Sequence, residues 1–342
     1  MRKYLLPETG NFYKVNMHSH SNFSDGVQTP EQLKELYKAE GYSAIAYTEH
    51  EALFDFTHLN DDDFLALTSY EYALGNYSNP AHCFYEGKPT CFADIEQMHL
   101  NLYAKDPHNK KQICFNPAFI GEKQKALLGE FSYVGEGDFK KEWTIECINE
   151  IIKTARDNGF LVCYNHPYWS MNTYETYSKL ENLNMLEINN GASNRGSDMD
   201  YTPYVYDQML RLGKRISCVG GDDNHNTIHF FKAWTMVKAE SLTHENILNA
   251  IEAGNTYASS GPEIYELYFE DEKVHIKCSE ADSVYIYTAG RRRSRTSELK
   301  EGESLTEATF EIKPTDHYFR LTVKDKNGKY ANTRAYFLDE LK

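Results

Sequence analysis

From residue 15 to about residue 255, strand-like runs alternate with helical patterns along this chain. TIECINEIIKTARDNG is followed by FLVCYNHP, and YTPYVYDQMLRLG is followed by RISCVGGDDNH. Strands that alternate with helices imply a parallel sheet with right-handed crossovers. Thr29-Pro30-Glu31 opens one of the helical patterns as an N-cap with proline at the first helical position, and Gly41 ends it. These signals predict an α/β fold for most of the chain.

The side chains that could do chemistry fall where these strands are expected to end. His18 and His20 close one strand-like run, and His50 closes the next. Residues at i and i+2 on a strand point the same way, and Asp223 and His225 repeat that spacing. Active sites of β/α barrels are built at the carboxyl ends of the strands. We therefore expect imidazoles and carboxylates to meet on one face of a barrel-like fold.

A larger set of histidines and carboxylates fits this placement. The candidate metal ligands are His18, His20, Asp25, His50, Glu71, His82, His166, Asp223 and His225. Imidazole and carboxylate together suit zinc, manganese or iron, and such ions activate water for hydrolysis. The set predicts a site for two or three divalent ions and a metal-dependent hydrolase.

Composition excludes several other classes of protein. The net charge of −15 argues against a broad nucleic-acid-binding face, which needs clustered Lys and Arg. The chain has no run of about 18 apolar residues and no signal-peptide pattern at its start, so we expect no membrane span and a cytoplasmic location. Seven cysteines without a C-x-x-C motif make a disulfide framework or a zinc knuckle a poor explanation.

Two segments depart from the strand–helix alternation. Residues 84–140 are predicted to be a partly helical insertion in a barrel domain of residues 1–258, either a lid or recognition segment over the mouth or a plain structural excursion. Residues 259–342 contain VHIKC, SVYIYT, ATFEIK and YFRLTVKD, which predict a small antiparallel β domain. That domain could bind carbohydrate or protein, mediate a dimer contact, or wall the active site.

The ordered motifs resemble a known family. H-x-H, SDG, T-E-H, a lone Glu, H-P and a terminal D-x-H are similar to the polymerase-and-histidinol-phosphatase (PHP) superfamily of metallohydrolases, over residues 14–255. The ASSGP stretch at residues 258–262, followed by a β module, further resembles the carbaryl-hydrolase-like branch. The resemblance implies a distorted seven-stranded β/α barrel that holds up to three metal ions.

The resemblance also assigns ligands to each ion. The first set is His18, His20, Glu71 and Asp223; the second is Asp25, His50 and His225; the third is bridging Glu71 with His82 and His166. Because Asp222 and Asp223 are adjacent, either could be the aspartate ligand of the last motif. We prefer Asp223, because its i, i+2 spacing with His225 puts both side chains on one side. Glu49 is expected to partner a ligating histidine. The remaining histidines are interpreted as structural: His58, His99, His108, His229, His244, His275 and His317.

The expected activity is a phosphoesterase that acts on a small phosphorylated metabolite, a nucleotide or a sugar phosphate, by attack of a metal-bridging hydroxide. The same hydroxide could instead hydrolyse an ester, amide or carbamate, and a non-catalytic binding domain is the alternative of another class. Arg195 is the candidate residue for binding the phosphate, and the alternative is that it is a solvated arginine in a loop. If Arg195 points away from the site, hydrolysis of an ester, amide or carbamate is favoured. Tyr168 and Trp169 either stack on a substrate ring or cap the barrel. The oligomeric state stays open.

Overall fold

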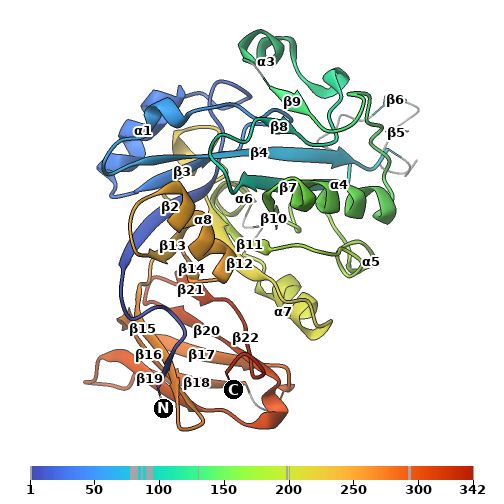
Figure 1. The fold of residues 1–342 in the computed structure, drawn as a ribbon. Coiled ribbons are helices and arrows are strands. Elements are labelled where there is room, and N and C mark those ends of the chain that lie inside the picture. Colours follow the sequence, from blue (N-terminus) through green and yellow to red (C-terminus); the bar gives the residue numbers. More distant parts are fainter. Residues whose placement is uncertain are drawn as a thin grey trace.

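The structure is a computed structural model that describes residues 2–77, 84–85, 88–89, 95–129, 131–197, 199, 201–291 and 294–341. A large sheet with helices around it forms one part of the molecule, and a region built of strands forms the other (Figure 1). Both termini lie at the all-strand end. The predicted mixture of α and β structure is confirmed. No helix within the described ranges has the length and apolar character needed to cross a membrane.

Seven neighbouring strands of the large sheet surround the candidate ligands. In spatial order they are β2 (Asn11–Ser19), β3 (Ala44–Tyr47), β4 (Leu65–Gly75), β7 (Gln97–Ala104), β10 (Phe160–Tyr164), β11 (Met185–Asn190) and β12 (Ser217–Gly221). β2, β3 and β4 are parallel to one another, as are β10, β11 and β12. β7 runs antiparallel to both β4 and β10. The prediction of a parallel sheet is therefore wrong at β7. An antiparallel neighbour needs no helical crossover, so the alternation of strands and helices does not reveal such a strand.

The two ends of this series approach each other at the candidate site. Ser19 and Asn224 form an isolated parallel bridge, and the Asp223 amide donates to the His18 carbonyl at 2.8 Å. A Cβ at Gly221 would lie 2.6 Å from the His18 Cβ, so this close approach requires glycine. Within the described residues a single bridge, not a ladder, joins the segment after β12 to β2, and the other edge pairing of β2 is with β13 (Trp234–Ala239). A closed seven-stranded barrel is not confirmed.

Amphipathic helices pack on the sheet. The longer ones are α1 (Pro30–Ala39), α4 (Ile145–Asp157), α7 (Pro203–Arg211) and α8 (His244–Ala253); the shorter ones are α3 (Glu122–Leu127), α5 (Tyr174–Tyr177) and α6 (Gly191–Ser197). Thr29 caps α1 by accepting from the Gln32 amide, and Gln32 reciprocates to complete a capping box, as the N-terminal signal predicts. Short 3-10 turns lie at Thr57–Leu59, Pro117–Phe119, Thr227–His229 and Pro314–Asp316.

The segment predicted as an insertion contains a central strand. Every residue of β7 is buried, and the strand pairs on both edges. The interpretation of residues 84–140 as an insertion is wrong for 97–104, because Gln97, His99 and Asn101 alternate with apolar residues and hide the strand's apolar character. The rest of the segment includes β5 (Phe84–Tyr85), β6 (Lys88–Pro89), β8 (Lys111–Gln112) and β9 (Ser132–Tyr133). With α3, β8 and β9 lie above β4 in Figure 1.

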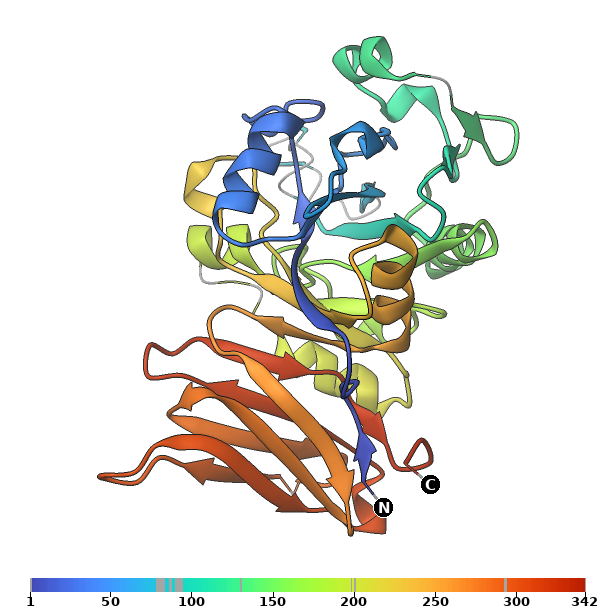
Figure 2. The ribbon, with the colours of Figure 1, turned by 60° about the vertical axis from the view of Figure 1, so that its left-hand side comes forward.

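The C-terminal strands pair antiparallel, as predicted, but they belong to two sheets (Figure 2). One continues the large sheet through β13 (Trp234–Ala239), β14 (Thr256–Ser259), β21 (Tyr330–Thr333), β20 (Tyr318–Lys324), β17 (Ser283–Thr288) and β18 (Arg295–Glu298), with β22 (Tyr336–Phe337) on β20. The other contains β1 (Lys3–Tyr4), β15 (Ile264–Glu270), β16 (Lys273–Ala281) and β19 (Leu305–Glu311). Leu267, Ile276, Ile286 and Leu321 belong to their shared core. Because β14 pairs with β21, a boundary at residue 259 stays a prediction.

Candidate metal centre

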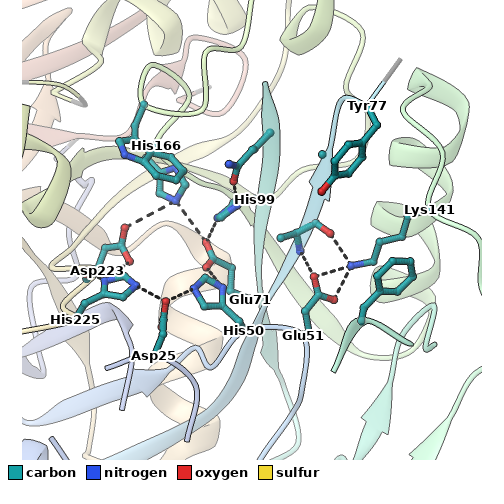
Figure 3. A pocket seen from close by; sticks show the side chains of 15 residues that line it. Asp25, His50, Glu51, Glu71, Tyr77, His99, Lys141, His166, Asp223 and His225 are labelled. Carbon is teal, nitrogen blue, oxygen red and sulfur yellow. Dashed lines mark hydrogen bonds and ion pairs between the residues drawn. The ribbon is translucent and has the colours of Figure 1, made fainter. Parts of the chain in front are cut away.

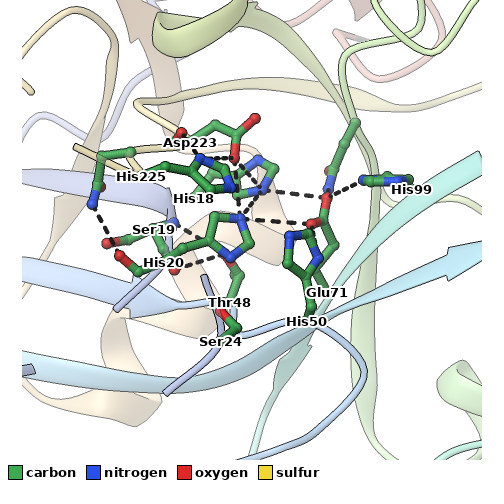
Figure 4. Close-up of polar contacts among 12 residues, drawn as sticks. His18, Ser19, His20, Ser24, Thr48, His50, Glu71, His99, Asp223 and His225 are labelled. Atoms are coloured by element: carbon green, nitrogen blue, oxygen red, sulfur yellow. Dashed lines mark hydrogen bonds and ion pairs between the residues drawn. The ribbon is translucent and has the colours of Figure 1, made fainter. Parts of the chain in front are cut away.

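The candidate ligands come together at one end of the seven strands (Figure 4). His18 lies on β2 with His20 just beyond it, His50 follows β3, Glu71 lies on β4, His166 follows β10, and Asp223 and His225 follow β12. Their nitrogen and carboxylate oxygen atoms form three overlapping groups, each with all its ligand atoms within 4.8 Å of one another. The groups are His20, Asp25, His50 and His225; His18, Glu71 and His166; and His18, His20 and Asp223.

The innermost contacts are made by His18. Its Nε2 lies 3.3 Å from Glu71 Oε1, 3.3 Å from Asp223 Oδ1 and 3.2 Å from His20 Nε2. Its Nδ1 lies 3.0 Å from Glu187 Oε1. When Nδ1 donates its proton to Glu187, Nε2 carries a lone pair and faces other acceptors. Such a convergence of acceptors is the environment of a cation, so these residues fit a divalent metal ion.

A second group gathers around Asp25 and is more open to solvent. Asp25 Oδ2 lies 3.5 Å from His50 Nε2 and 3.4 Å from His225 Nε2. The His225 Nδ1 donates to the Asp223 carbonyl at 2.9 Å, which turns its Nε2 towards Asp25. The His50 and His225 rings both stack on His20, with ring centroids 4.3 and 4.4 Å away. Three imidazoles and a carboxylate are thus arranged as a second set of metal-binding atoms.

Glu71 connects these groups to a third. His166 Nε2 lies 3.4 Å and His99 Nδ1 3.0 Å from Glu71 Oε1, while His50 Nδ1 lies 3.0 Å from Oε2. His99, predicted to be structural, is 5% exposed and contacts Glu71, although it is in none of the three groups. The sequence signal for His99 was the alternation of polar and apolar residues along β7, which is typical of a strand. His82, predicted for this role, lies outside the described residues.

Charge couples the groups strongly. Burial alone would raise the pKa of Glu71, but the surrounding imidazoles, His99 and His18 foremost, hold it well below its usual range. Burial would lower the pKa of His18, and the carboxylates of Asp223, Glu187 and Glu71 instead raise it well above normal. Burial and then the charges of His50 and His225 lower the pKa of His20 to about 3. A divalent ion would replace the proton that the carboxylates otherwise hold on His18.

Two residues that the sequence analysis missed position the ligands. Glu187 on β11 accepts from the His166 amide at 3.2 Å and from Asn190 Nδ2 at 3.0 Å, besides contacting His18. Asn190 also donates to Asp223 Oδ2 at 3.1 Å. Glu187 is buried within the apolar run LNMLEINN. A carboxylate in such a run needs a polar partner in the interior, and this could have indicated its role from the sequence. The pair fixes the orientation of His18 and Asp223.

Asp222 and Glu49 have structural partners. Asp222 accepts from the Tyr37 hydroxyl and from the Lys232 amide, both at 2.7 Å, and the structure brings Asp223 to the cluster instead. Glu49 accepts from the Ser21 and Ser24 amides at 3.0 Å each. The prediction that Glu49 partners a ligating histidine is wrong, because its carboxylate shapes the loop that leads to Asp25.

Backbone conformation is unusual at two of the ligands. His166 and Asp223 have positive φ angles of 22° and 49°. Non-glycine residues in this region are strained, and such strain persists where surrounding contacts impose it. Here the Glu187 carboxylate holds the His166 amide, and the His18 carbonyl holds the Asp223 amide.

A cavity of about 580 Å³ opens beside the cluster (Figure 3). Asp25, His50, Glu71, His99, His166, Asp223 and His225 line one part of it, and Glu51, Ala73, Gly75, Tyr77, Gln97, Phe119, Lys141 and Trp169 line the rest. Among the described lining residues Lys141 is the only lysine or arginine. Arg195 lies on α6, is exposed and does not line the cavity. Trp169 lines it, and its neighbour Tyr168 is exposed outside it.

No family model and no curated protein matches the chain. Among solved structures, a two-domain protein from Bacteroides vulgatus that contains a predicted PHP-like metal-dependent phosphoesterase is 14% identical, with 97% of this chain and 98% of that chain covered and a TM-score of 0.44. A candidate metal-dependent phosphoesterase from Bifidobacterium adolescentis is 15% identical, covering 69% and 94%, with a TM-score of 0.37. An amidohydrolase from Chromobacterium violaceum with bound sulfate and no metal is 14% identical, covering 62% and 87%, with a TM-score of 0.36.

At these identities and TM-scores the function is inferred from the side chains of the site alone. The carbaryl-hydrolase-like branch stays a prediction.

Proposed function

We propose that this chain is a metal-dependent phosphoesterase of the PHP type that acts on a small phosphorylated metabolite of the nucleotide or sugar phosphate class. The observation that carries the proposal is the convergence of imidazole and carboxylate atoms around Glu71 and Asp223 at the wall of an open cavity. The strand order from β2 to β12 suits the distorted barrel of that family. The ions are zinc, manganese or iron, all of which this ligand chemistry accepts.

The residues divide among two or three ions. His18, His20, Glu71 and Asp223 would hold the first, Asp25, His50 and His225 the second, and Glu71, His99 and His166 the third. Bound divalent ions supply Lewis acidity, which lowers the pKa of water to about 7 and neutralises charge that develops on a phosphoryl group.

The chain's own side chains determine how a substrate would approach. His18, His20, Glu71 and His166 are almost completely buried, whereas His50, His225 and Asp25 keep 26%, 29% and 54% of their side-chain surface exposed. A phosphate ester therefore reaches the centre from the side of Asp25. Glu187 and Asn190 are buried, and their contacts keep His18 and Asp223 in place.

A second candidate is a metal-dependent hydrolase of carboxylic esters, amides or carbamates. Two observations favour it: Arg195 does not line the cavity, and Lys141, which does, is already paired with Glu51. A substrate without a phosphate would need no cation beyond the metal ions. The phosphoesterase proposal instead requires those ions to bind the phosphate by themselves.

Phosphate release distinguishes the two candidates. The protein is loaded with manganese or zinc and assayed on a panel of phosphomonoesters and phosphodiesters, with chelator-treated protein and Asp223→Ala as controls. We expect release that chelator abolishes and that Asp223→Ala lowers severely. A metal-replete protein that releases no phosphate, yet hydrolyses aryl esters, amides or carbamates, would establish the second candidate.

A further inference from the structure

The cavity extends beyond the metal cluster over a floor of very small residues. Glu71, Ala73 and Gly75 alternate along β4 and all line the cavity. Alternate residues of a strand lie about 7 Å apart, so Ala73 and Gly75 extend the floor by one and two such steps from Glu71. On the paired strand, His99 lies opposite Ala73 and Gln97 opposite Gly75. Because Ala73 and Gly75 have such small side chains, the cavity has room beside the metal centre. When one end of a substrate is held at Glu71, its other end can occupy this space.

Aromatic side chains form the walls of this extension. Phe119, Tyr77 and Trp169 all line the cavity and are 43%, 63% and 38% exposed. Phe119 lies beside Lys141, whose Nζ is 4.5 Å from the ring centroid. The Trp169 ring stands edge-on to His166, with ring centroids 5.0 Å apart, which places it beside the metal cluster. Partly exposed aromatic rings that share a cavity with a polar cluster favour a ligand that is flat and apolar on its faces.

A buried ion pair lies at the side of the same extension (Figure 3). Lys141 Nζ lies 2.6 Å from each carboxylate oxygen of Glu51 and 2.6 Å from the Ala73 carbonyl. These contacts occupy its three N–H donors. The Lys141 and Glu51 side chains are 9% and 15% exposed.

The pair offers the cavity an acceptor and no donor. Besides Lys141, Glu51 Oε1 accepts from the Ala73 amide at 3.2 Å. A carboxylate has about four acceptor positions, so the contacts among the described residues leave one available. Because the two charges cancel and the donors of Lys141 are occupied, the pair suits an uncharged N–H or O–H donor better than a second anion.

We propose that this half of the cavity is a specificity subsite for a flat, uncharged ring that carries hydrogen-bond donors, the chemical class of a nucleobase. Glu51 accepts from an N–H of the ring, and the side chains of Phe119 and Tyr77 contact the ring, while Trp169 lies nearer the metal centre. The inference rests on the proposed function, since the phosphate attached through the sugar is the group held at the metal centre. The subsite selects nucleotides over phosphates of acyclic alcohols, because an acyclic alcohol would leave the aromatic side chains without a contact.

Specificity ratios test the subsite. The measured quantity is kcat/KM for nucleoside 5′-monophosphates divided by kcat/KM for glycerol phosphate, with metal-loaded protein. Phe119→Ala removes one wall without changing charge, and we expect the ratio to fall about tenfold, the usual effect of losing one stacking partner. Tyr204→Ala is the matched control, since Tyr204 is an exposed aromatic on α7 that does not line the cavity. An unchanged ratio in Phe119→Ala overturns the proposal.

The ion pair is tested separately. Glu51→Gln removes the acceptor charge, and the double variant Glu51→Gln with Lys141→Met removes both charges, so that no unpaired lysine is left buried. We expect both to lower the same ratio by about tenfold or more, the effect of losing one hydrogen bond to a charged group. If the pair is only a structural brace, both variants lower the unfolding temperature and leave the ratio unchanged, which contradicts the assigned role.

A binding measurement separates failure of the subsite from failure of the proposed function. Adenosine, which has no phosphate, is the probe for ligand-observed NMR with the metal-loaded protein. We expect saturation transfer to adenosine that Phe119→Ala weakens and Tyr204→Ala does not. Chelator-sensitive phosphate release together with no adenosine binding overturns the subsite alone. Adenosine binding without any phosphate release supports the subsite and refutes the phosphoesterase.

Discussion

Glu187 provides the sharpest test of how the structure organises the metal centre. It is not among the described residues that line the cavity beside the cluster, and its carboxylate reaches His18 Nδ1 at 3.0 Å and the His166 amide at 3.2 Å. We therefore predict that Glu187→Gln preserves the fold and weakens metal binding. The amide has nearly the same shape, but it lacks the charge that favours the Nδ1–H tautomer of His18 and increases the basicity of its Nε2.

Known partners of metal-bound histidines set the expected magnitude. Loss of such a carboxylate weakens metal affinity by about 10- to 100-fold, which is about 1.4–2.7 kcal/mol. The dissociation constant of the tightest ion is measured by competition with a chromogenic chelator. Glu252→Gln is the matched control, because Glu252 pairs with Lys105 on the surface. Equal metal affinity in wild type and Glu187→Gln would refute the reasoning, whereas a general loss of stability would appear in the unfolding transition.

Three further predictions concern a ligand, an ion pair and a buried histidine. His99→Ala lowers the metal content of the purified protein by up to one ion per chain. The same elemental analysis of His82→Ala tests the histidine that the sequence predicts for this role, and the two results decide which histidine joins Glu71. Arg320→Met breaks the buried pair in which Arg320 Nε lies 2.6 Å from Asp207 Oδ1, linking β20 to α7. It lowers the free energy of unfolding by about 3–5 kcal/mol in urea titrations, and Asp207→Asn added to it recovers part of the loss. Burial lowers the pKa of His244 below 6.5 in the folded protein. As the pH falls, His244 therefore binds a proton more readily in the unfolded chain than in the folded protein. His244 therefore costs stability as the pH falls below 6.5, and the urea midpoint of His244→Gln should fall less between pH 7 and pH 5 than that of wild type; parallel curves would contradict this.

Local signals in the sequence predict part of this fold well. Thr29 and Pro30 start α1, and the i, i+2 spacing places His18 beside His20 and Asp223 beside His225. These features depend on neighbours a few residues apart, where backbone geometry decides the outcome. The antiparallel character of the C-terminal strands is local in the same way.

Features that depend on distant partners were not accessible from the pattern. β7 was missed because its polar residues face the metal centre, so the functional surface itself disguised the strand, and His99 was lost with it. The role of Glu187 depends on a contact with His18, 169 positions away in the chain. Lys141 and Glu51 are 90 positions apart, and neither lies in a recognisable motif.

The number of metal ions bound per chain tests the central claim most directly. The protein is purified without chelator, dialysed against trace metal-free buffer after loading with manganese or zinc, and analysed by inductively coupled plasma mass spectrometry. The geometry of the centre predicts two to three ions per chain in the wild type and a clear loss in Asp223→Ala, whose carboxylate lies within reach of His18 and His20. Less than one ion per chain in the wild type, or the same number in both proteins, would contradict the account.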